Sequence, residues 1–150
     1  MKILRNILAL IGGAIVGMIV NMGLILMSSS IIAPPPGADM TTAEGITAAM
    51  PILEYKHFIM PFLAHALGTL VGALVAGLVA ASHQTKFALG IGAFFLLGGI
   101  ANMYQIPHPT WFAIIDMTLA YIPMGILGGM WAMKIMAPKD SNEEVLDLSD

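Results

Sequence analysis

The chain has 150 residues, of which 58% are hydrophobic and only 10% are charged, with a formal net charge of −3. A soluble domain usually carries about 25% charged residues, so this composition places the chain among integral membrane proteins. The absence of cysteine excludes disulfides, thiolate metal sites and cysteine nucleophiles, and the scattered Lys and Arg residues form no basic patch for a nucleic acid.

Four segments are long and apolar enough to cross a bilayer as helices, which requires about 20 mostly apolar residues each. They cover roughly residues 7–27, 58–81, 87–104 and 111–136. The sequence therefore predicts an all-α, polytopic membrane protein, folded as a four-transmembrane-helix bundle over residues 1–139. Residues 140–150 are predicted to form a solvated acidic tail.

The first segment has a second interpretation, because it follows the basic start Met1-Lys2-Ile3-Leu4-Arg5 of a signal peptide. Its apolar region of about 21 residues is longer than the usual 7–15 of a signal peptide. No small-x-small cleavage site follows it in SSSIIAPPPG. We therefore expect a helix that is retained in the membrane.

The connection over residues 28–57 is the long outer loop of the predicted bundle. After the break at Pro34-Pro35-Pro36-Gly37, Thr41 and Glu44 have the spacing of a capping box. This spacing predicts a short interfacial helix at about 42–50, ended near Pro51. The helix is either a lid over the outer mouth of the bundle or a simple interfacial linker.

The basic residues predict the orientation, because cytoplasmic loops are enriched in Lys and Arg. With both termini in the cytoplasm (N-in/C-in), only Lys56 lies outside, and five basic residues lie inside: Lys2, Arg5, Lys86, Lys134 and Lys139. We expect the protein to be integral to the inner, cytoplasmic membrane of a bacterium. The acidic tail is then cytoplasmic as well.

Small residues recur in every predicted span, where they let helix backbones approach closely. The GxxxG spacing and its relatives involve Gly13 with Gly17, Gly68 with Gly72, and Gly125 with Gly129, while the third span carries Gly90, Gly92, Gly98 and Gly99. This pattern predicts close helix packing. It leaves open whether the packed neighbours belong to the same chain or to another copy in an oligomer.

A rise of about 1.5 Å per residue places at least one polar side chain of each span in the outer half of the membrane. His65 lies about 10 Å, Asn21 about 9 Å and Asp116 about 8 Å below the outer boundary, with Asn102 just beneath it and Tyr121 near mid-membrane. The shared depth predicts a polar pocket in the outer half, because the inner halves of the last three spans are nearly all apolar.

An ionisable group at this depth is costly unless it is paired, hydrated or neutral. His65 is the candidate partner of Asp116, and Asn21, Asn102 and Tyr121 could supply further hydrogen bonds. These five residues are the candidate ligand- or proton-binding site. In the alternative interpretation, His65 makes an interhelical hydrogen bond that fixes packing, and Asp116 is a snorkelling or protonated acid near the interface.

Above this layer, Glu54, His57 and His108 are predicted to line the outer mouth, near Tyr55 and Gln105. The first three could bind a metal if their side chains converged. A solvated interfacial trio is the simpler interpretation, so we expect no metal and no other cofactor. Pro61 and Pro123 are predicted to free backbone groups and to kink their helices.

No catalytic motif of the HExxH, GxSxG or phosphate-loop type is present, and Ser28, Ser29 and Ser30 lack an adjacent base. The sequence therefore gives little support to an enzyme. Two functions remain: the pocket binds or moves a small solute, ion or proton, or the protein is a non-catalytic structural or accessory subunit of a larger membrane complex. The expected partners are the lipid bilayer and either further copies of the chain or other membrane subunits, without nucleic acid.

Overall fold

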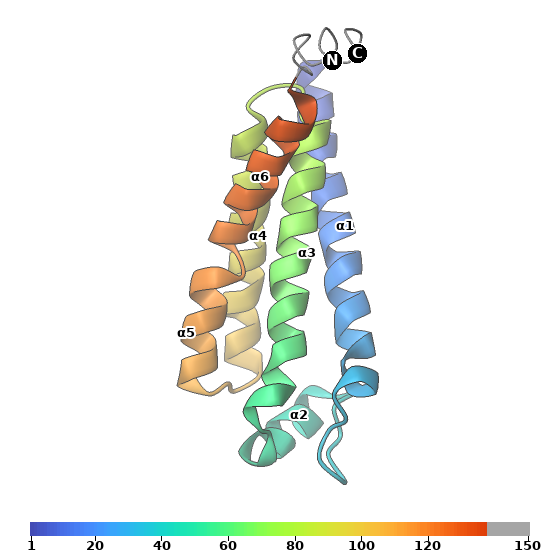
Figure 1. The fold of residues 1–150 in the computed structure, drawn as a ribbon, viewed down its shortest axis with the longest axis vertical. Helices are drawn as coiled ribbons and strands as arrows, with labels where there is room; N and C mark the ends of the chain where they lie inside the picture. Colours follow the sequence, from blue (N-terminus) through green and yellow to red (C-terminus); the bar gives the residue numbers. More distant parts are fainter. Residues whose placement is uncertain (138–150) are drawn as a thin grey trace, which may run out of the picture.

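The structure is a computed structural model that describes residues 1–137, and over this range it is helical without any strand (Figure 1). The predicted acidic tail at 140–150 lies outside the described residues. The long helices are α1 (Lys2–Ile31), α3 (Ile59–Val79) and α4 (Gln84–Gln105), followed by the pair α5 (Thr110–Leu119) and α6 (Ile122–Met136). Between α1 and α3 lie the short helix α2 (Ala43–Ala49) and two 3-10 turns, η1 (Met50–Ile52) and η2 (Tyr55–Phe58).

Four helical stretches are long and apolar enough to cross a membrane: Lys2–Ile31, Tyr55–Val79, Gln84–Gln105 and Thr110–Met136. This confirms the four predicted spans and indicates an integral membrane protein. The observed helices extend beyond the predicted spans at most ends, because helical hydrogen bonding continues into the flanking polar residues. The second span is the exception at its end, since its helix stops at Val79, two residues before the predicted end at 81.

The long helices lie side by side along one axis, so the bundle has two ends (Figure 1). The start of α1 and the end of α6 share one end, here called the terminal end, and α2 lies at the other, here called the α2 end. α3 makes the most extensive contacts of any helix described, with α1, α4 and α6, and is therefore the central helix.

The contact between α1 and α3 depends on glycine. A Cβ atom on Gly13 would lie 2.6 Å from the carbonyl oxygen of Gly72, and a Cβ atom on Gly17 would lie 2.7 Å from that of Gly68. Neither distance leaves room for a side chain, so the two backbones touch directly. In the terminal half the buried core consists of equally small residues and one isoleucine, namely Ala73, Ala76, Ala88 and Ile91.

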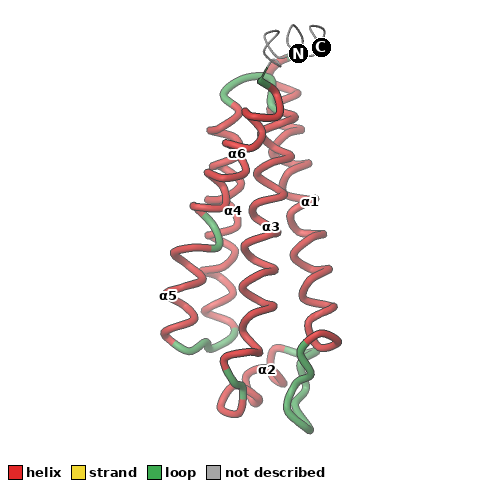
Figure 2. The backbone as a smooth tube through the Cα atoms, in the orientation of Figure 1, coloured by secondary structure: helices red, strands yellow, loops and turns green. Residues whose placement is uncertain are grey.

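The fourth span is interrupted where the prediction had one continuous helix with a kink. α5 ends at Leu119 and α6 begins at Ile122, and Figure 2 shows the interruption as a loop segment partway along the bundle. Pro123 causes it, because proline has no N–H to donate to the carbonyl of Leu119 and its ring clashes with that carbonyl in a helix. Pro61, by contrast, lies in the first turn of α3, where proline removes no bond of the α-helix.

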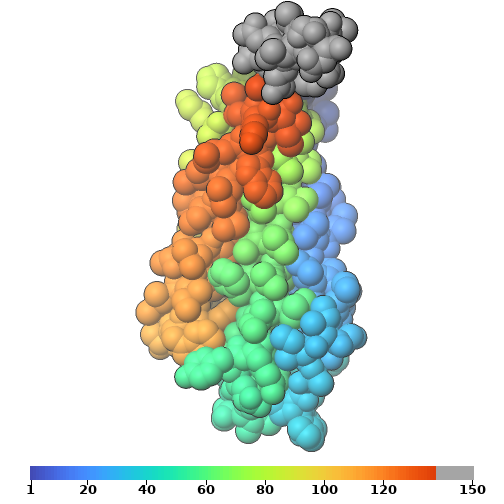
Figure 3. Space-filling model, viewed as in Figure 1, coloured from blue at the N-terminus to red at the C-terminus, as the bar shows by residue number. Residues whose placement is uncertain are grey.

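The connection between α1 and α3 covers the α2 end of the bundle, as the cyan and green atoms in Figure 3 show. The short helix predicted at 42–50 is present as α2, but its N-cap is Thr42 rather than Thr41. The Thr42 hydroxyl oxygen accepts a hydrogen bond from the Gly45 amide at 3.0 Å. Thr41 instead donates its hydroxyl to Asp39 at 2.6 Å, because the Asp39 carboxylate faces both threonines.

The Asp39 carboxylate makes the folding of this connection sensitive to acid. Hydrogen bonds from the Thr41 hydroxyl, the Thr41 amide and the Thr42 hydroxyl hold the pKa of Asp39 below its ordinary value of 3.8. Because the folded pKa is the lower one, the stabilisation is present above pH 3.8 and is lost as the pH falls through the folded pKa. We expect the protection of the Gly45 amide from hydrogen exchange, relative to its intrinsic rate at each pH, to fall on acidification below that pH, and an Asp39→Asn variant to show no such fall.

Candidate functional site

A cavity of about 470 Å³ lies in the half of the bundle nearer α2. Its walls come from α1, α3 and α4, from the α5–α6 junction, and from the connection that covers the α2 end. Most of the lining is apolar. The polar residues on the wall are Asn21, Ser28, Ser29, His57, His65, Asn102, His108 and Tyr121, and within residues 1–137 no Lys, Arg, Asp or Glu lines it.

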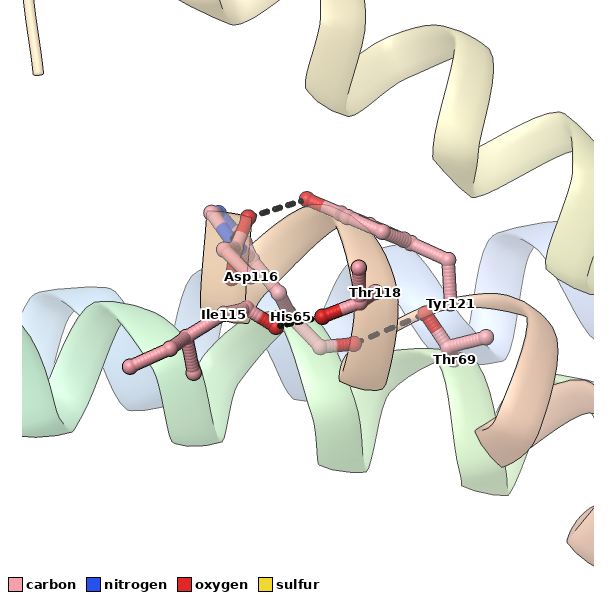
Figure 4. Close-up of polar contacts among 6 residues, drawn as sticks. All are labelled: His65, Thr69, Ile115, Asp116, Thr118 and Tyr121. Atoms are coloured by element: carbon pink, nitrogen blue, oxygen red, sulfur yellow. Dashed lines mark hydrogen bonds and ion pairs between the residues drawn. The ribbon is translucent and has the colours of Figure 1, made fainter. Parts of the chain in front are cut away.

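His65, Asp116 and Tyr121 form one hydrogen-bonded group at the deep side of this cavity (Figure 4). The Nδ1 atom of His65 lies 2.9 Å from Oδ1 and 3.0 Å from Oδ2 of Asp116. The Tyr121 hydroxyl donates to Oδ2 of Asp116 at 2.9 Å. Asp116 itself is 1% exposed and lies behind His65 and Tyr121, so the carboxylate is held away from the cavity by its two partners.

The break in the fourth span is what allows Tyr121 to reach Asp116. In an unbroken helix, residues five apart are separated by about 140° around the axis and do not face each other. Here the chain leaves the helix at Ala120 and Tyr121, and the hydroxyl of Tyr121 returns to the carboxylate. The ring of Tyr121 also stacks on the imidazole of His65, with centroids 5.8 Å apart.

Gly99 of α4 makes room for the Tyr121 hydroxyl. A Cβ atom at this position would clash with the hydroxyl oxygen and would lie 2.6 Å from the ring carbon that carries it. A small residue is therefore required at this point of α4 for the Tyr121–Asp116 bond to form.

The bond to Asp116 also determines what His65 presents to the cavity. A carboxylate accepts hydrogen bonds, so Nδ1 carries the proton that it shares with Asp116. The hydrogen bonds of His65 to Asp116 use Nδ1, which leaves Nε2 as the nitrogen available on the cavity side. In the neutral imidazole this Nε2 is a hydrogen-bond acceptor. The backbone of His65 makes a further hydrogen bond, because its carbonyl accepts from the Thr69 hydroxyl at 2.7 Å.

Asn21 of α1 and Asn102 of α4 lie on the walls of the same cavity as His65. Within residues 1–137, neither amide side chain takes part in a hydrogen bond with another residue of the chain. Each amide can both donate and accept. Beside the His65 Nε2, the cavity wall therefore carries two groups that can either donate or accept.

His57, predicted at the outer mouth, lines the cavity but has both ring nitrogens bonded to the backbone. Its Nδ1 accepts from the Glu54 amide at 2.9 Å, and its Nε2 donates to the Ala33 carbonyl at 3.2 Å. These bonds tie η2 to the segment that follows α1. In this structure the imidazole thus holds the connection in place.

His108 lies on the cavity wall in the loop between α4 and α5, stacked on Phe112 with ring centroids 5.5 Å apart. Its Nδ1 is buried and has no hydrogen-bond partner among the described residues. Burial lowers the pKa of His108 below its ordinary value of 6.5, so the neutral imidazole is favoured near neutral pH.

Glu54, the third residue predicted at the mouth, lines a different surface cavity of about 410 Å³ next to Trp111 and Pro109. Its Oε1 pairs with the Lys56 ammonium at 3.2 Å, and both side chains are exposed. Across residues 1–137, no three His, Cys, Asp or Glu side chains come close enough together to hold a metal ion. Glu54, His57 and His108 thus do not form one set of ligands in this structure.

Two contributions to the cavity are not apparent in the sequence. Gly98 and Gly99 line the wall, although the other glycines of α4 give the same sequence signal. Met40 and Met50 of the connection close the cavity at the α2 end, together with Ile46 and Leu53. The sequence pointed to the second contribution only indirectly, through the short helix predicted to lie over the outer mouth.

Comparison with known proteins gave no relatives: no protein-family model matches the chain, and neither the curated proteins nor the solved structures contain a match. The function must therefore be inferred from the cavity and its residues.

Proposed function

We propose that this integral membrane protein binds a small ligand in the cavity between α1, α3 and α4, with His65 Nε2 as the principal polar contact. The observation that carries the proposal is the hydrogen bond of His65 Nδ1 to the buried Asp116 carboxylate at 2.9 Å. A carboxylate on one imidazole nitrogen fixes the ring and leaves the other nitrogen to interact with a ligand. Asn21 and Asn102 are proposed as further contacts, and Tyr121 as the group that holds Asp116.

Binding is favoured over transport across the membrane. The cavity lining stops at His65, Phe95 and Met18 toward the terminal end. Beyond it, α1 and α3 meet through glycine backbones, and the core consists of Ala73, Ala76, Ala88 and Ile91. No ionisable group in that core could pass an ion or a proton onward, so the ligand is proposed to stay in the half of the bundle nearer α2.

The proposed orientation has both termini in the cytoplasm of a bacterium and the cavity in the outer half of the inner membrane. It is supported by the basic residues at the terminal end, which include Lys2 and Arg5 of α1, Lys86 of α4 and Lys134 of α6, against Lys56 alone at the α2 end (Figure 1). In this orientation α2 is proposed to lie at the outer interface.

The alternative function is that of an accessory subunit docked on a larger membrane complex or on further copies of the chain. It is favoured by α1, which buries only 11% of its most apolar stretch in the bundle, compared with 44% for the span containing α3. Lipid covers such a face equally well. Stoichiometric copurification with larger membrane proteins, without ligand binding, would support this alternative.

The test uses His65→Asn, because the asparagine amide occupies the place of Nδ1 and can still donate to Asp116, whereas Nε2 is removed. We expect the variant to remain folded and to bind a short photoactivatable alcohol about tenfold more weakly, which corresponds to roughly 1.4 kcal/mol or one hydrogen bond. The readout is photolabelling of the cavity-lining peptides in nanodiscs, measured by mass spectrometry.

The matched control is His83→Asn. His83 is exposed in the loop before α4 and has a positive φ of 52°, a conformation that asparagine tolerates well. Labelling should be unchanged in this control. Unchanged labelling in a folded His65→Asn protein, or no labelling of the cavity in the unmodified protein, would contradict the proposed function.

A further inference from the structure

Exposed residues among the cavity lining indicate an opening on the side of the bundle, between α1 and α4. The two helices touch from the terminal half to about the middle of the bundle, where Leu10 lies near Gly90 and Phe95 lies against Gly17. Farther toward the α2 end, α1 and α4 line opposite walls of the cavity instead of meeting. Three lining residues at this point are exposed: Met18 at 47%, Met22 at 55%, and Gly98 of α4. A Cβ atom on Gly98 would meet no other atom within 4 Å.

The depth of this side opening places it in the hydrocarbon of a bilayer. Gly98 lies about 5 Å from the middle of α4, and Met18 and Met22 lie within about 8 Å of the middle of α1, taking 1.5 Å per residue. The hydrocarbon core extends about 15 Å to either side of the membrane centre. The opening therefore faces acyl chains rather than water.

The α2 end of the same cavity is lined largely by apolar side chains of the connection. Met40, Ile46, Met50 and Leu53 line it there, and Phe58 beside them is only 6% exposed, although the exposed Ser29 of α1 lines the cavity as well. A solute coming from the aqueous side has to pass between these half-buried side chains, whereas a molecule dissolved in the membrane reaches the exposed Gly98 directly. The geometry thus favours entry from the lipid.

The lining residues also decide which polar head group a ligand entering from the membrane can carry. The polar side chains on the wall include the His65 Nε2 acceptor and the amides of Asn21 and Asn102, and all of them are neutral when the imidazoles are neutral. No Lys or Arg within residues 1–137 lines the cavity, so no permanently charged cation is there to pair with a phosphate. A hydroxyl group satisfies this set, because it donates to Nε2 and accepts from an amide. Met18, Met22 and Ile25 supply an apolar wall for a chain.

We infer that the ligand is a neutral amphiphile with a hydroxyl head group, which enters the cavity sideways from the membrane between α1 and α4. The hydroxyl binds at His65, and the apolar chain leaves through the opening at Gly98 and Met22 into the surrounding lipid. A volume of about 470 Å³ is within the usual range for a small-molecule site and suits a head group with the first part of a chain. This inference rests on the proposed function, since it assigns the ligand class of the same site.

The experiment compares two photoactivatable primary alcohols, one long-chain and membrane-dissolved, the other short and water-soluble, on the protein in nanodiscs. The blocking variant is Gly98→Phe, whose side chain has open space at the opening. The matched control is Gly23→Phe on α1, a position in the same half of the bundle that also has no atom within 4 Å of a Cβ and does not line the cavity.

We expect the long-chain alcohol to label the cavity-lining peptides more strongly than the short one. Gly98→Phe should lower the long-chain labelling at least tenfold, and Gly23→Phe should leave it unchanged. The inference is overturned if the short alcohol labels the cavity and the long one does not, or if Gly98→Phe leaves the long-chain labelling intact.

These failures differ from failure of the proposed function. If only the route or ligand class is wrong, His65→Asn still lowers labelling by the short alcohol. If neither alcohol labels the cavity, both proposals fall together. If a second copy of the chain fills the opening, the long-chain alcohol does not label the unmodified protein. In that case the unmodified protein is a dimer, and Gly98→Phe is a monomer.

Discussion

Replacing Asp116 by leucine is expected to lower the free energy of unfolding by about 3 kcal/mol. The carboxylate is 1% exposed and accepts from both His65 Nδ1 and the Tyr121 hydroxyl. Leucine has a similar branched shape but accepts neither bond, so the buried Tyr121 hydroxyl and the half-buried His65 Nδ1 lose their partner. The measurement is equilibrium unfolding in mixed micelles by titration with a denaturing detergent.

Two comparisons separate this effect from a general sensitivity of α5. Thr118 is exposed on the same helix and bonds only to the carbonyls of its own helix, so Thr118→Val should change stability by less than about 0.5 kcal/mol. Adding His65→Phe and Tyr121→Phe to Asp116→Leu removes the unpaired donors and should restore part of the loss. An Asp116→Leu protein as stable as the unmodified one would show that this hydrogen-bonded group contributes nothing to the fold.

The second large effect is expected at Gly72, where α3 meets both α1 and α4. A Cβ atom there would lie 2.6 Å from the carbonyl oxygen of Gly13, 3.2 Å from the Cα of Gly17 and 3.3 Å from Ile91. The first two contacts are backbone, which cannot rotate away, so α1 must move outward. Gly72→Ala should therefore lower the free energy of unfolding by about 1–3 kcal/mol in the same detergent titration.

Gly12→Ala is the control for Gly72→Ala, because Gly12 is also inside a long helix and has no atom within 4 Å of a Cβ. Alanine favours helix over glycine, so stability should be unchanged or slightly raised there. Equal losses in the two variants would mean that helix propensity, rather than the α1–α3 contact, decides the outcome.

The spans could be predicted from the sequence because their signal is composition over length, which requires no knowledge of neighbours. The exact ends of the helices are harder to predict from the sequence. The N-cap of α2 is Thr42 rather than Thr41 because Asp39 takes both threonine hydroxyls as donors, leaving the Thr42 oxygen to accept from Gly45. That choice depends on a three-residue arrangement that the capping-box spacing does not contain.

The juxtaposition of His65 and Asp116 illustrates the limit for the candidate site. Depth along each helix follows from residue number, and the two side chains were expected at similar depth. Their direct contact requires that α3 lie beside α5 and that both helices be rotated toward each other, which the sequence does not encode locally. The role of Tyr121 is harder still, because it depends on the break before Pro123 and on the space that Gly99 leaves.

The glycines show the same limit. Gly98 and Gly99 are adjacent and look equivalent in the sequence, yet one faces the opening of the cavity and the other receives the Tyr121 hydroxyl. Only the rotation of α4 within the bundle distinguishes them. The choice between ligand binding and subunit docking depends on such rotations, because they determine which side chains face the cavity and which face the lipid.

The most direct test of the central claim is the ¹⁵N NMR spectrum of histidine-labelled protein in lipid bilayers near neutral pH, assigned for His65 by comparison with His65→Asn. We predict that the ring carries a proton at Nδ1 and that the Nε2 resonance shifts when a long-chain alcohol is added. In Asp116→Asn this proton should be partly lost from Nδ1, because the asparagine amide can donate to Nδ1. A His65 ring without a proton at Nδ1 in the unmodified protein, or an Nε2 resonance unmoved by the alcohol, would contradict the account.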